Sequence, residues 1–344
     1  TTENACILIG SNAGQKIGVD SGTGGDGQVF IGFAAGQDID TGEGNTGIGY
    51  KALELEDDGD FNTAVGYQAL AVQQGTSGTV GNTAVGYQAG KAITTGVGNT
   101  TVGYASQYLA TTGNENTSVG YLALNETRAS NQNTAVGYHA LQEVRSGSDA
   151  DVDSLNTAVG WKAGDDITTG IQNSGFGAAT AFDVDANNQT ALGYGATTDS
   201  ANDIAIGNTS VDEVKGQVDF TTFSDKRIKK DIIDGDLGLD FINDLRPRKF
   251  KKVNPAEYPK SIKKRNDGKG MEWTDAQANK VWDGLVAQEV KEAMDKAGTT
   301  FSGWSEESNS KQLVGYSTMV VPLIKAVQEL SAEVKSLKQQ LEDK

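Results

Sequence analysis

Hydrophobic and polar positions alternate over short stretches that recur along the first two thirds of the chain. "NTAVGYQAL" begins at Asn62, and near-copies begin at Asn82, Asn99, Asn116 and Asn133. Within each copy, small, apolar and polar residues alternate with a period of two. Val and Tyr favour extended backbone, so the pattern predicts a short β-strand. The Asn-Thr pair that opens each copy is typical of a turn.

The copies follow one another at a nearly constant interval. Counted by their central glycines, from Gly10 to Gly207, six of the eleven spacings are 17 residues and the others range from 14 to 23. A fixed period with tolerated insertions indicates stacked repeats, in which each unit covers the next. We therefore expect a rod built from one repeated rung over residues 1–210.

The rungs contain little aliphatic bulk. Each rung offers roughly one Val or Ile, one aromatic residue and one or two Ala. Because a single chain would bury only a thin core of this kind, the composition favours three chains sharing one axis. The tyrosines after the central glycine could pack against neighbouring rungs or stack on sugars, and we expect the first.

Composition and charge divide the chain near residue 220. Of the 44 glycines, 36 lie at or before that residue, whereas all four prolines lie after it. Residues 1–220 contain 7 Lys/Arg and 26 Asp/Glu, a net charge of −19, and the remainder contains 22 and 20, a net charge of +2. A −19 segment excludes nucleic-acid binding by counterion release and is repelled by anionic membrane surfaces. Since no apolar run reaches about 18 residues, we expect no membrane insertion.

Apolar residues near the C-terminus recur in alternating steps of three and four, which is a heptad pattern with Val at a and Leu at d. This trimerisation seam consists of Val320, Leu323, Val327, Leu330, Val334, Leu337 and Leu341. It predicts a coiled-coil helix over residues 319–344, with the ordinary core face of a helix as the alternative. In isolation this pattern favours a coiled coil of two helices. We expect three helices, because the coiled coil must match the three chains expected for the rod.

Four segments after the rod resemble, in order, the intramolecular chaperone domain of endosialidases, other phage tail spikes and fibres, and the myelin regulatory factor, the peptidase S74 family. They are "SDKRIKKDI" (224–232), "GLDFINDLRPRKFKK" (238–252), "GLVAQEVKEAM" (284–294) and "YSTMVVPLIKAVQEL" (316–330). On its own the first segment is typical of a helix N-cap followed by a solvated basic face. The ordered set of four favours membership of the family.

The resemblance implies a domain that trimerises the chain, assists folding of the upstream rod and then cuts itself off. Carried over by position, Ser224 is the nucleophile and Lys229 is its base. The expected cleavage site lies between Phe223 and Ser224, and the bond between Ser224 and Asp225 is the alternative. Such a protein is at most a single-turnover, self-cleaving serine peptidase.

The chemistry of a Ser-Lys dyad is plausible from the residues themselves. A serine hydroxyl is a weak nucleophile and needs a base within hydrogen-bond reach. A lysine serves as that base only where burial or neighbouring cations favour its neutral form. Lys226, Arg227 and Lys230 are the available cations, and Asp225 acts in the opposite direction. The single histidine, His139, lies in the repeats and does not offer another base.

The repeats themselves, in stretches such as "SVGYLA", "TALGYGA" and "DIAIGNTS", resemble the head repeats of trimeric autotransporter adhesins and phage tail fibres. The resemblance implies a mainly β fold: a trimeric parallel β-roll or solenoid, then a mixed α/β chaperone domain ending in a trimeric coiled-coil helix. We expect the rod over 1–210, a connector over 211–223, the chaperone domain over 224–318 and the helix over 319–344. Such heads often repeat nearer 14 than 17 residues, so the period departs from the family pattern; this difference bears on the exact roll geometry and not on the stacking.

These resemblances imply a virion structural protein, a distal tail fibre or spike segment for host attachment, made in the host cytoplasm. Its expected partners are two further copies of itself, other virion tail proteins, and a glycan or protein receptor on the host cell surface. No cofactor and no metal are expected. A bacterial trimeric surface adhesin is one alternative. A glycan-degrading tailspike is another, although no motif here supplies the paired carboxylates of a glycosidase.

Overall fold

The computed structural model describes residues 5–18, 25–74, 78–144, 152–217, 220–263, 273–307 and 310–343. The chain forms two compact units. Thr1–Asn208 make up most of the first, which we call the rod, and Thr209–Lys263 with Asp267–Lys344 make up the second, which we call the C-terminal unit. Among the described residues, no helix is long and apolar enough to cross a membrane.

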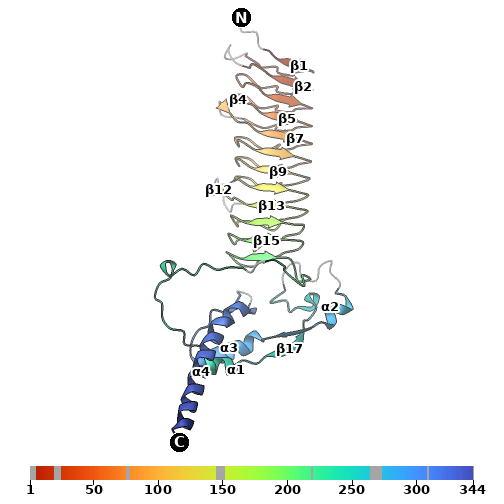
Figure 1. The fold of residues 1–344 in the computed structure, drawn as a ribbon. Helices are drawn as coiled ribbons and strands as arrows, with labels where there is room; N and C mark the ends of the chain where they lie inside the picture. The colour runs from red at the N-terminus through yellow and green to blue at the C-terminus, as the bar shows by residue number, and fades with distance from the viewer. Residues whose placement is uncertain are drawn as a thin grey trace. The chain divides into compact units, whose positions relative to one another are not determined.

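The rod is a β-solenoid whose main sheet contains twelve parallel strands stacked in chain order (Figure 1). The strands are β1 (Ile7–Ile9), β2 (Val29–Ile31), β3 (Thr46–Ile48), β5 (Thr63–Val65), β7 (Thr83–Val85), β8 (Thr100–Val102), β9 (Thr117–Val119), β11 (Thr134–Val136), β13 (Thr157–Val159), β14 (Ser174–Phe176), β15 (Thr190–Leu192) and β16 (Ile204–Ile206). Equivalent positions of successive repeats pair directly, as Ala64 does with Ala84. The predicted fold class, a mainly β solenoid followed by a small α/β region and a C-terminal helix, is confirmed.

Two short parallel pairs lie outside the main sheet. They are β4 (Gly59–Asp60) with β6 (Gly78–Thr79), and β10 (Ser130–Asn131) with β12 (Val152–Asp153). Each joins segments that precede consecutive rungs. The insertions between rungs therefore extend the stacking instead of interrupting it.

Each rung buries its core inside a single chain. In β5 the side chain of Ala64 is fully buried, whereas Val65 lies on the outward side and is only partly covered. The backbone then turns through Gly66 and through Gln68, both with positive φ, and Leu70 enters the core from the opposite side. The largest fully buried apolar side chains of the rod are Phe30, Ile39, Leu53, Leu70, Ile93, Leu124, Leu141 and Ile167. Of the residues counted for each rung, Ala therefore lies in the core and Val lies outside it, and the bulk of the core comes from Leu and Ile residues that the count did not include.

A ladder of buried asparagines runs along the rod. The backbone N–H of Asn62 donates to Asn45 Oδ1 at 2.8 Å, that of Asn82 to Asn62 Oδ1 at 3.0 Å, and that of Asn99 to Asn82 Oδ1 at 2.7 Å. The pattern continues through Asn116, Asn133, Asn156 and Asn173. Buried backbone donors are thereby satisfied by the preceding rung. This function explains why the repeat opens with Asn.

The aromatic residues that follow the central glycines form a second ladder on the outside. We call it the aromatic ladder; it consists of Phe33, Tyr50, Tyr67, Tyr87, Tyr104, Tyr121, Tyr138 and Trp161. Ring centroids of neighbours lie 5.0–5.4 Å apart as far as Tyr138, and the last step to Trp161 is 6.4 Å. The expectation that these tyrosines pack rung against rung is confirmed. Because each ring covers the face of the next, solvent reaches mainly ring edges and hydroxyl groups.

The C-terminal unit is small and mixed. Its elements are η1 (Lys226–Ile228), α1 (Leu239–Asp244), β17 (Arg248–Lys251), η2 (Pro255–Glu257), α2 (Asp275–Asn279), β18 (Val281–Gly284), α3 (Ala287–Ala297), β19 (Trp304–Glu306), β20 (Gln312–Val314), η3 (Tyr316–Met319) and α4 (Val320–Glu342). The pairs β17–β18 and β19–β20 are antiparallel. The core contains Phe241 from α1, Val290 and Met294 from α3, Phe301, and Met319 from η3. Three of the four family-like segments thus meet in one core.

Candidate functional site

The predicted dyad lies on a single tight turn. Asp225 is the N-cap of η1, and its carboxylate accepts a hydrogen bond from the backbone N–H of Arg227. The turn ends where the backbone N–H of Lys229 donates to the carbonyl of Lys226. An N-cap near Ser224 was expected, and the structure assigns it to Asp225. The turn folds the chain back so that residues 224 and 229 face each other.

The structure brings Ser224 and Lys229 together. Lys229 Nζ lies 2.6 Å from Ser224 Oγ, within hydrogen-bond distance. This is the geometry that a serine nucleophile and a lysine base require. His139, in contrast, belongs to the rod, where it stacks on Tyr138 with ring centroids 4.1 Å apart.

The dyad sits on an exposed segment. The side chains of Phe220 and Phe223 are 91 % and 96 % exposed, and Ile233 is 88 % exposed. Large apolar side chains normally lose most of their exposure on folding, since burying one contributes about 1.5–3 kcal/mol. A single copy of the chain leaves these groups on either side of Ser224 in water.

One charged neighbour of the dyad is neutralised locally. Arg227 Nε lies 3.0 Å from Asp225 Oδ1, and Arg227 Nη2 lies 2.7 Å from Asp225 Oδ2. These hydrogen bonds from Arg227 hold the pKa of the Asp225 carboxyl below its usual range. The sequence indicated that both residues influence the lysine but did not indicate that they bind each other.

Two carboxylates position the elements that carry the family-like segments. Glu329 of α4 accepts a hydrogen bond from the backbone N–H of Leu239 at 2.6 Å and so caps the start of α1. Glu289 of α3 pairs with Arg248 at 2.6 Å, and this hydrogen bond, with the nearby charge of Arg246, holds the pKa of Glu289 below its usual range. Removing either carboxylate would loosen the framework that follows the dyad.

The predicted trimerisation seam lies on α4 and is uncovered. Its seven residues are between 42 % and 73 % exposed. Pro322 and Ala326 are the buried residues of this helix, and every residue from Ser331 to Asp343 is exposed. An apolar stripe of this length on an otherwise solvated helix is typical of a coiled-coil partner surface. The alternative reading, a core face of this chain, does not fit the exposure.

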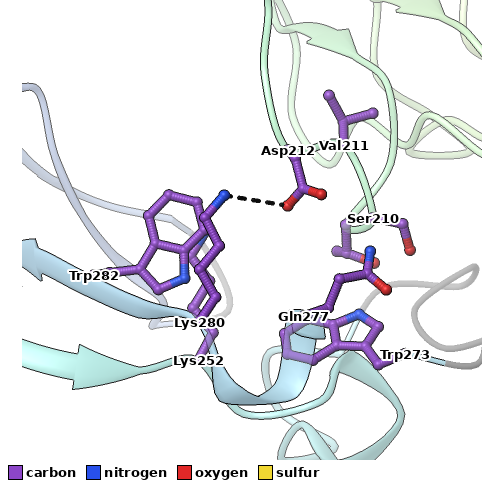
Figure 2. Close-up of a pocket in the computed structure, with 9 residues that line it drawn as sticks. Ser210, Val211, Asp212, Lys252, Trp273, Gln277, Lys280 and Trp282 are labelled. Atoms are coloured by element: carbon purple, nitrogen blue, oxygen red, sulfur yellow. Dashed lines mark ion pairs between the residues drawn. The ribbon is translucent and has the colours of Figure 1, made fainter. Parts of the chain in front are cut away.

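Figure 2 shows a small cavity in the C-terminal unit that sequence reasoning missed. The ammonium groups of Lys252 and Lys280 lie 3.9 Å and 4.1 Å from the ring centroid of Trp282. Lys280 also pairs with Asp212 at 3.7 Å. The cavity volume of about 20 Å³ holds roughly one water molecule, so it does not fit an organic ligand. Paired cation–π contacts of this kind leave no pattern in the sequence.

The C-terminal unit is similar to a known family. Residues 224–299 match the family described as chaperone of endosialidase, Peptidase_S74. The chain therefore carries an endosialidase-type chaperone domain. The match begins at Ser224, the first residue of the turn that holds the dyad. No curated protein and no solved structure matches the chain significantly.

Proposed function

We propose that the chain is a homotrimeric virion fibre segment whose endosialidase-type chaperone domain assembles three copies, assists folding of the rod and releases itself by autoproteolysis at Ser224. The observation that carries the proposal is the 2.6 Å contact between Ser224 Oγ and Lys229 Nζ at the first residue of the family match. In this role the rod is the distal part of a phage tail fibre or spike that attaches to the host surface.

The exposed seam of α4 supports the assembly of copies. Val327, Leu330 and Val334 are large apolar residues that the chain itself leaves in water. Burying such a stripe between identical helices is the interaction that holds a coiled coil together. The exposed apolar residues near the dyad, Phe220 and Phe223, would be covered by the same association.

The outward side of the rod's main sheet supports the same conclusion. The third residue of each strand in the main sheet is apolar. Five of these residues, Ile9, Val85, Val159, Phe176 and Ile206, are each at least 37 % exposed, and those on the other strands are partly buried. A continuous apolar column of this length exceeds the patches that monomeric proteins normally leave in water. Identical copies have identical rung spacing, so their columns match along the whole rod.

Since the aromatic ladder presents ring edges, we assign it to association between copies and not to a sugar-stacking platform.

The contact between Ser224 and Lys229 supports the following reaction. Ser224 Oγ attacks the carbonyl carbon of Phe223 while Lys229 Nζ takes the hydroxyl proton. The bond between the Phe223 carbon and the Ser224 nitrogen then breaks, and the lysine ammonium returns the proton to the leaving amine. Water hydrolyses the resulting ester, which leaves a carboxylate at Phe223 and restores the hydroxyl of Ser224. Because the serine becomes the new N-terminus, each chain reacts once.

Denatured mass measured over time tests this proposal. We expect two fragments from the wild type, divided between Phe223 and Ser224, and one intact chain from Ser224→Ala and from Lys229→Met. Lys230→Met is the matched control, because it removes a neighbouring ammonium that is not bonded to the serine, and it should cleave. An intact wild-type chain would refute the autoproteolytic part of the proposal. Equal cleavage of Lys229→Met and Lys230→Met would refute the role of the lysine.

A further inference from the structure

Both oxygens of the Asp225 carboxylate are occupied by one residue. The backbone N–H and the Nε of Arg227 donate to Oδ1 at 2.8 Å and 3.0 Å, and Nη2 donates to Oδ2 at 2.7 Å. This two-point contact uses the planar fork of the guanidinium, which a lysine ammonium cannot reproduce. The carboxylate next to the nucleophile is thereby oriented by a neighbour within the same turn.

An unbound Asp225 would compete for the base. It is the N-cap of the 3-10 turn Lys226–Ile228, and Lys229 is the residue that ends the same turn. A carboxylate paired with the ammonium would favour the charged lysine, which cannot accept a proton, and would draw Nζ away from Ser224. In the described part of the chain, the side chain of Lys229 is hydrogen bonded to Ser224 and forms no ion pair.

The other charged groups of this segment do not substitute for Arg227. Lys226 and Lys230 are cations, and Asp231 and Asp234 follow the turn and are exposed. Asp225 is the acid that directly adjoins Ser224 in the chain. By binding Asp225, Arg227 therefore holds the carboxylate that would otherwise compete with Ser224 for Lys229.

We infer that Arg227 is a positioning residue for self-cleavage: its guanidinium binds the Asp225 carboxylate and so keeps Lys229 on Ser224. The inference rests on the proposed autoproteolytic function of the dyad. Arg227 acts through Asp225 and touches neither the serine nor the scissile bond. Its side chain is 88 % exposed, so the contribution comes from geometry and local charge and not from packing.

Two measurements on the full chain test the inference. The first is the pH profile of cleavage for the wild type, Arg227→Gln, Arg227→Lys and the double variant Arg227→Gln/Asp225→Asn. The pH of half-maximal rate should rise by about half a unit to one unit in Arg227→Gln, which lowers the rate up to about tenfold below the midpoint. It should rise less in Arg227→Lys and return toward the wild-type value in the double variant. Arg246→Gln is the control, because it removes a cation from a pair with Glu289 that lies outside the turn.

The second measurement does not depend on cleavage. In the Ser224→Ala background, acetic anhydride labelling of Lys229 is followed by peptide mass spectrometry across the same pH range. Arg227→Gln should move half-maximal labelling to higher pH, and addition of Asp225→Asn should reverse the move. An unchanged midpoint in Arg227→Gln, or a double variant that remains as displaced as the single one, would overturn the inference. Wild-type chain that never cleaves, with labelling midpoints that shift as expected, would instead reject the proposed function and retain only the control of Lys229 by Asp225 and Arg227.

Discussion

Replacing Asn99 by Ala tests the asparagine ladder at its centre. The amide of Asn99 donates to the carbonyl of Gly113 at 2.8 Å, and its Oδ1 accepts from the backbone N–H of Asn116 at 3.0 Å. Both backbone groups belong to buried residues. Alanine leaves each of them without this partner in a site too enclosed for easy hydration.

The expected cost follows from these two groups. A buried polar group left without a partner costs about 1–3 kcal/mol, so Asn99→Ala should lower the free energy of unfolding of the rod by about 2–6 kcal/mol. Asn187→Ala is the matched control. Its Oδ1 accepts from the backbone N–H of Ile171 at 2.9 Å in an exposed loop, where water replaces the bond. That variant should change the free energy by no more than about 0.5 kcal/mol.

Urea unfolding followed by far-ultraviolet circular dichroism, together with hydrogen exchange of rod peptides, measures the difference. Because neighbouring rungs stabilise one another, exchange should accelerate most in the rungs beside residue 99 and least at the far strands. Equal unfolding midpoints for Asn99→Ala and Asn187→Ala would show that the ladder does not stabilise the rod. A uniform loss of protection along the rod would show that the rungs are not coupled through nearest neighbours.

Two further predictions concern the rung corners and the C-terminal unit. Gly120 has φ of +140° and a Cβ there would lie 2.4 Å from the carbonyl oxygen of Gly137, so Gly120→Ala should lower the urea midpoint. Gly298→Ala should be milder, because the space around Gly298 is open and only its left-handed backbone, about 1–2 kcal/mol, is penalised. Arg248 lowers the pKa of Glu289, so the stability from this pair is present above the unfolded pKa of about 4.3 and is lost as pH falls through the folded value. Thermal midpoints read from tryptophan fluorescence should therefore differ between wild type and Glu289→Gln at pH 7 and converge at low pH; a constant difference down to pH 2 would contradict the assignment.

The regular spacing of the repeats predicted the rod, but it could not predict which side chains of each rung face inward. Strands of three residues leave a single inward position, and Ala occupies the central position in six of the twelve strands, as at Ala64. Leu70 reaches the core only because the backbone adopts positive φ at Gln68 and again at Leu70 itself. Such φ values are uncommon for residues other than glycine, and no local propensity indicates them. The sequence therefore did not indicate that the Val of each rung faces outward while a residue after the glycine turn, such as Leu70, fills the core.

In the C-terminal unit, the family resemblance supplied the candidate dyad, the heptad pattern supplied the candidate seam, and the structure supplied the contacts. The five-residue separation of Ser224 and Lys229 was compatible with a shared turn, and the distance of 2.6 Å shows that they meet. The pairing of Arg227 with Asp225 was not predicted, because charge counting treats each as acting on the lysine separately. The enclosure of Trp282 by two lysines was missed for a different reason, since it depends on the pairing of β17 with β18.

The native mass of the full chain tests most directly whether the C-terminal unit assembles copies through α4. The Ser224→Ala chain should be measured beside the same chain with Leu330→Asp and Leu337→Asp, and beside a control with Gln328→Asp and Gln339→Asp, which lie on α4 outside the seam. We predict three times the chain mass of 36.0 kDa for Ser224→Ala and for the control, and a lower mass for the seam variant. A single-chain mass for Ser224→Ala, or a seam variant that keeps the full mass of the control, would contradict the account.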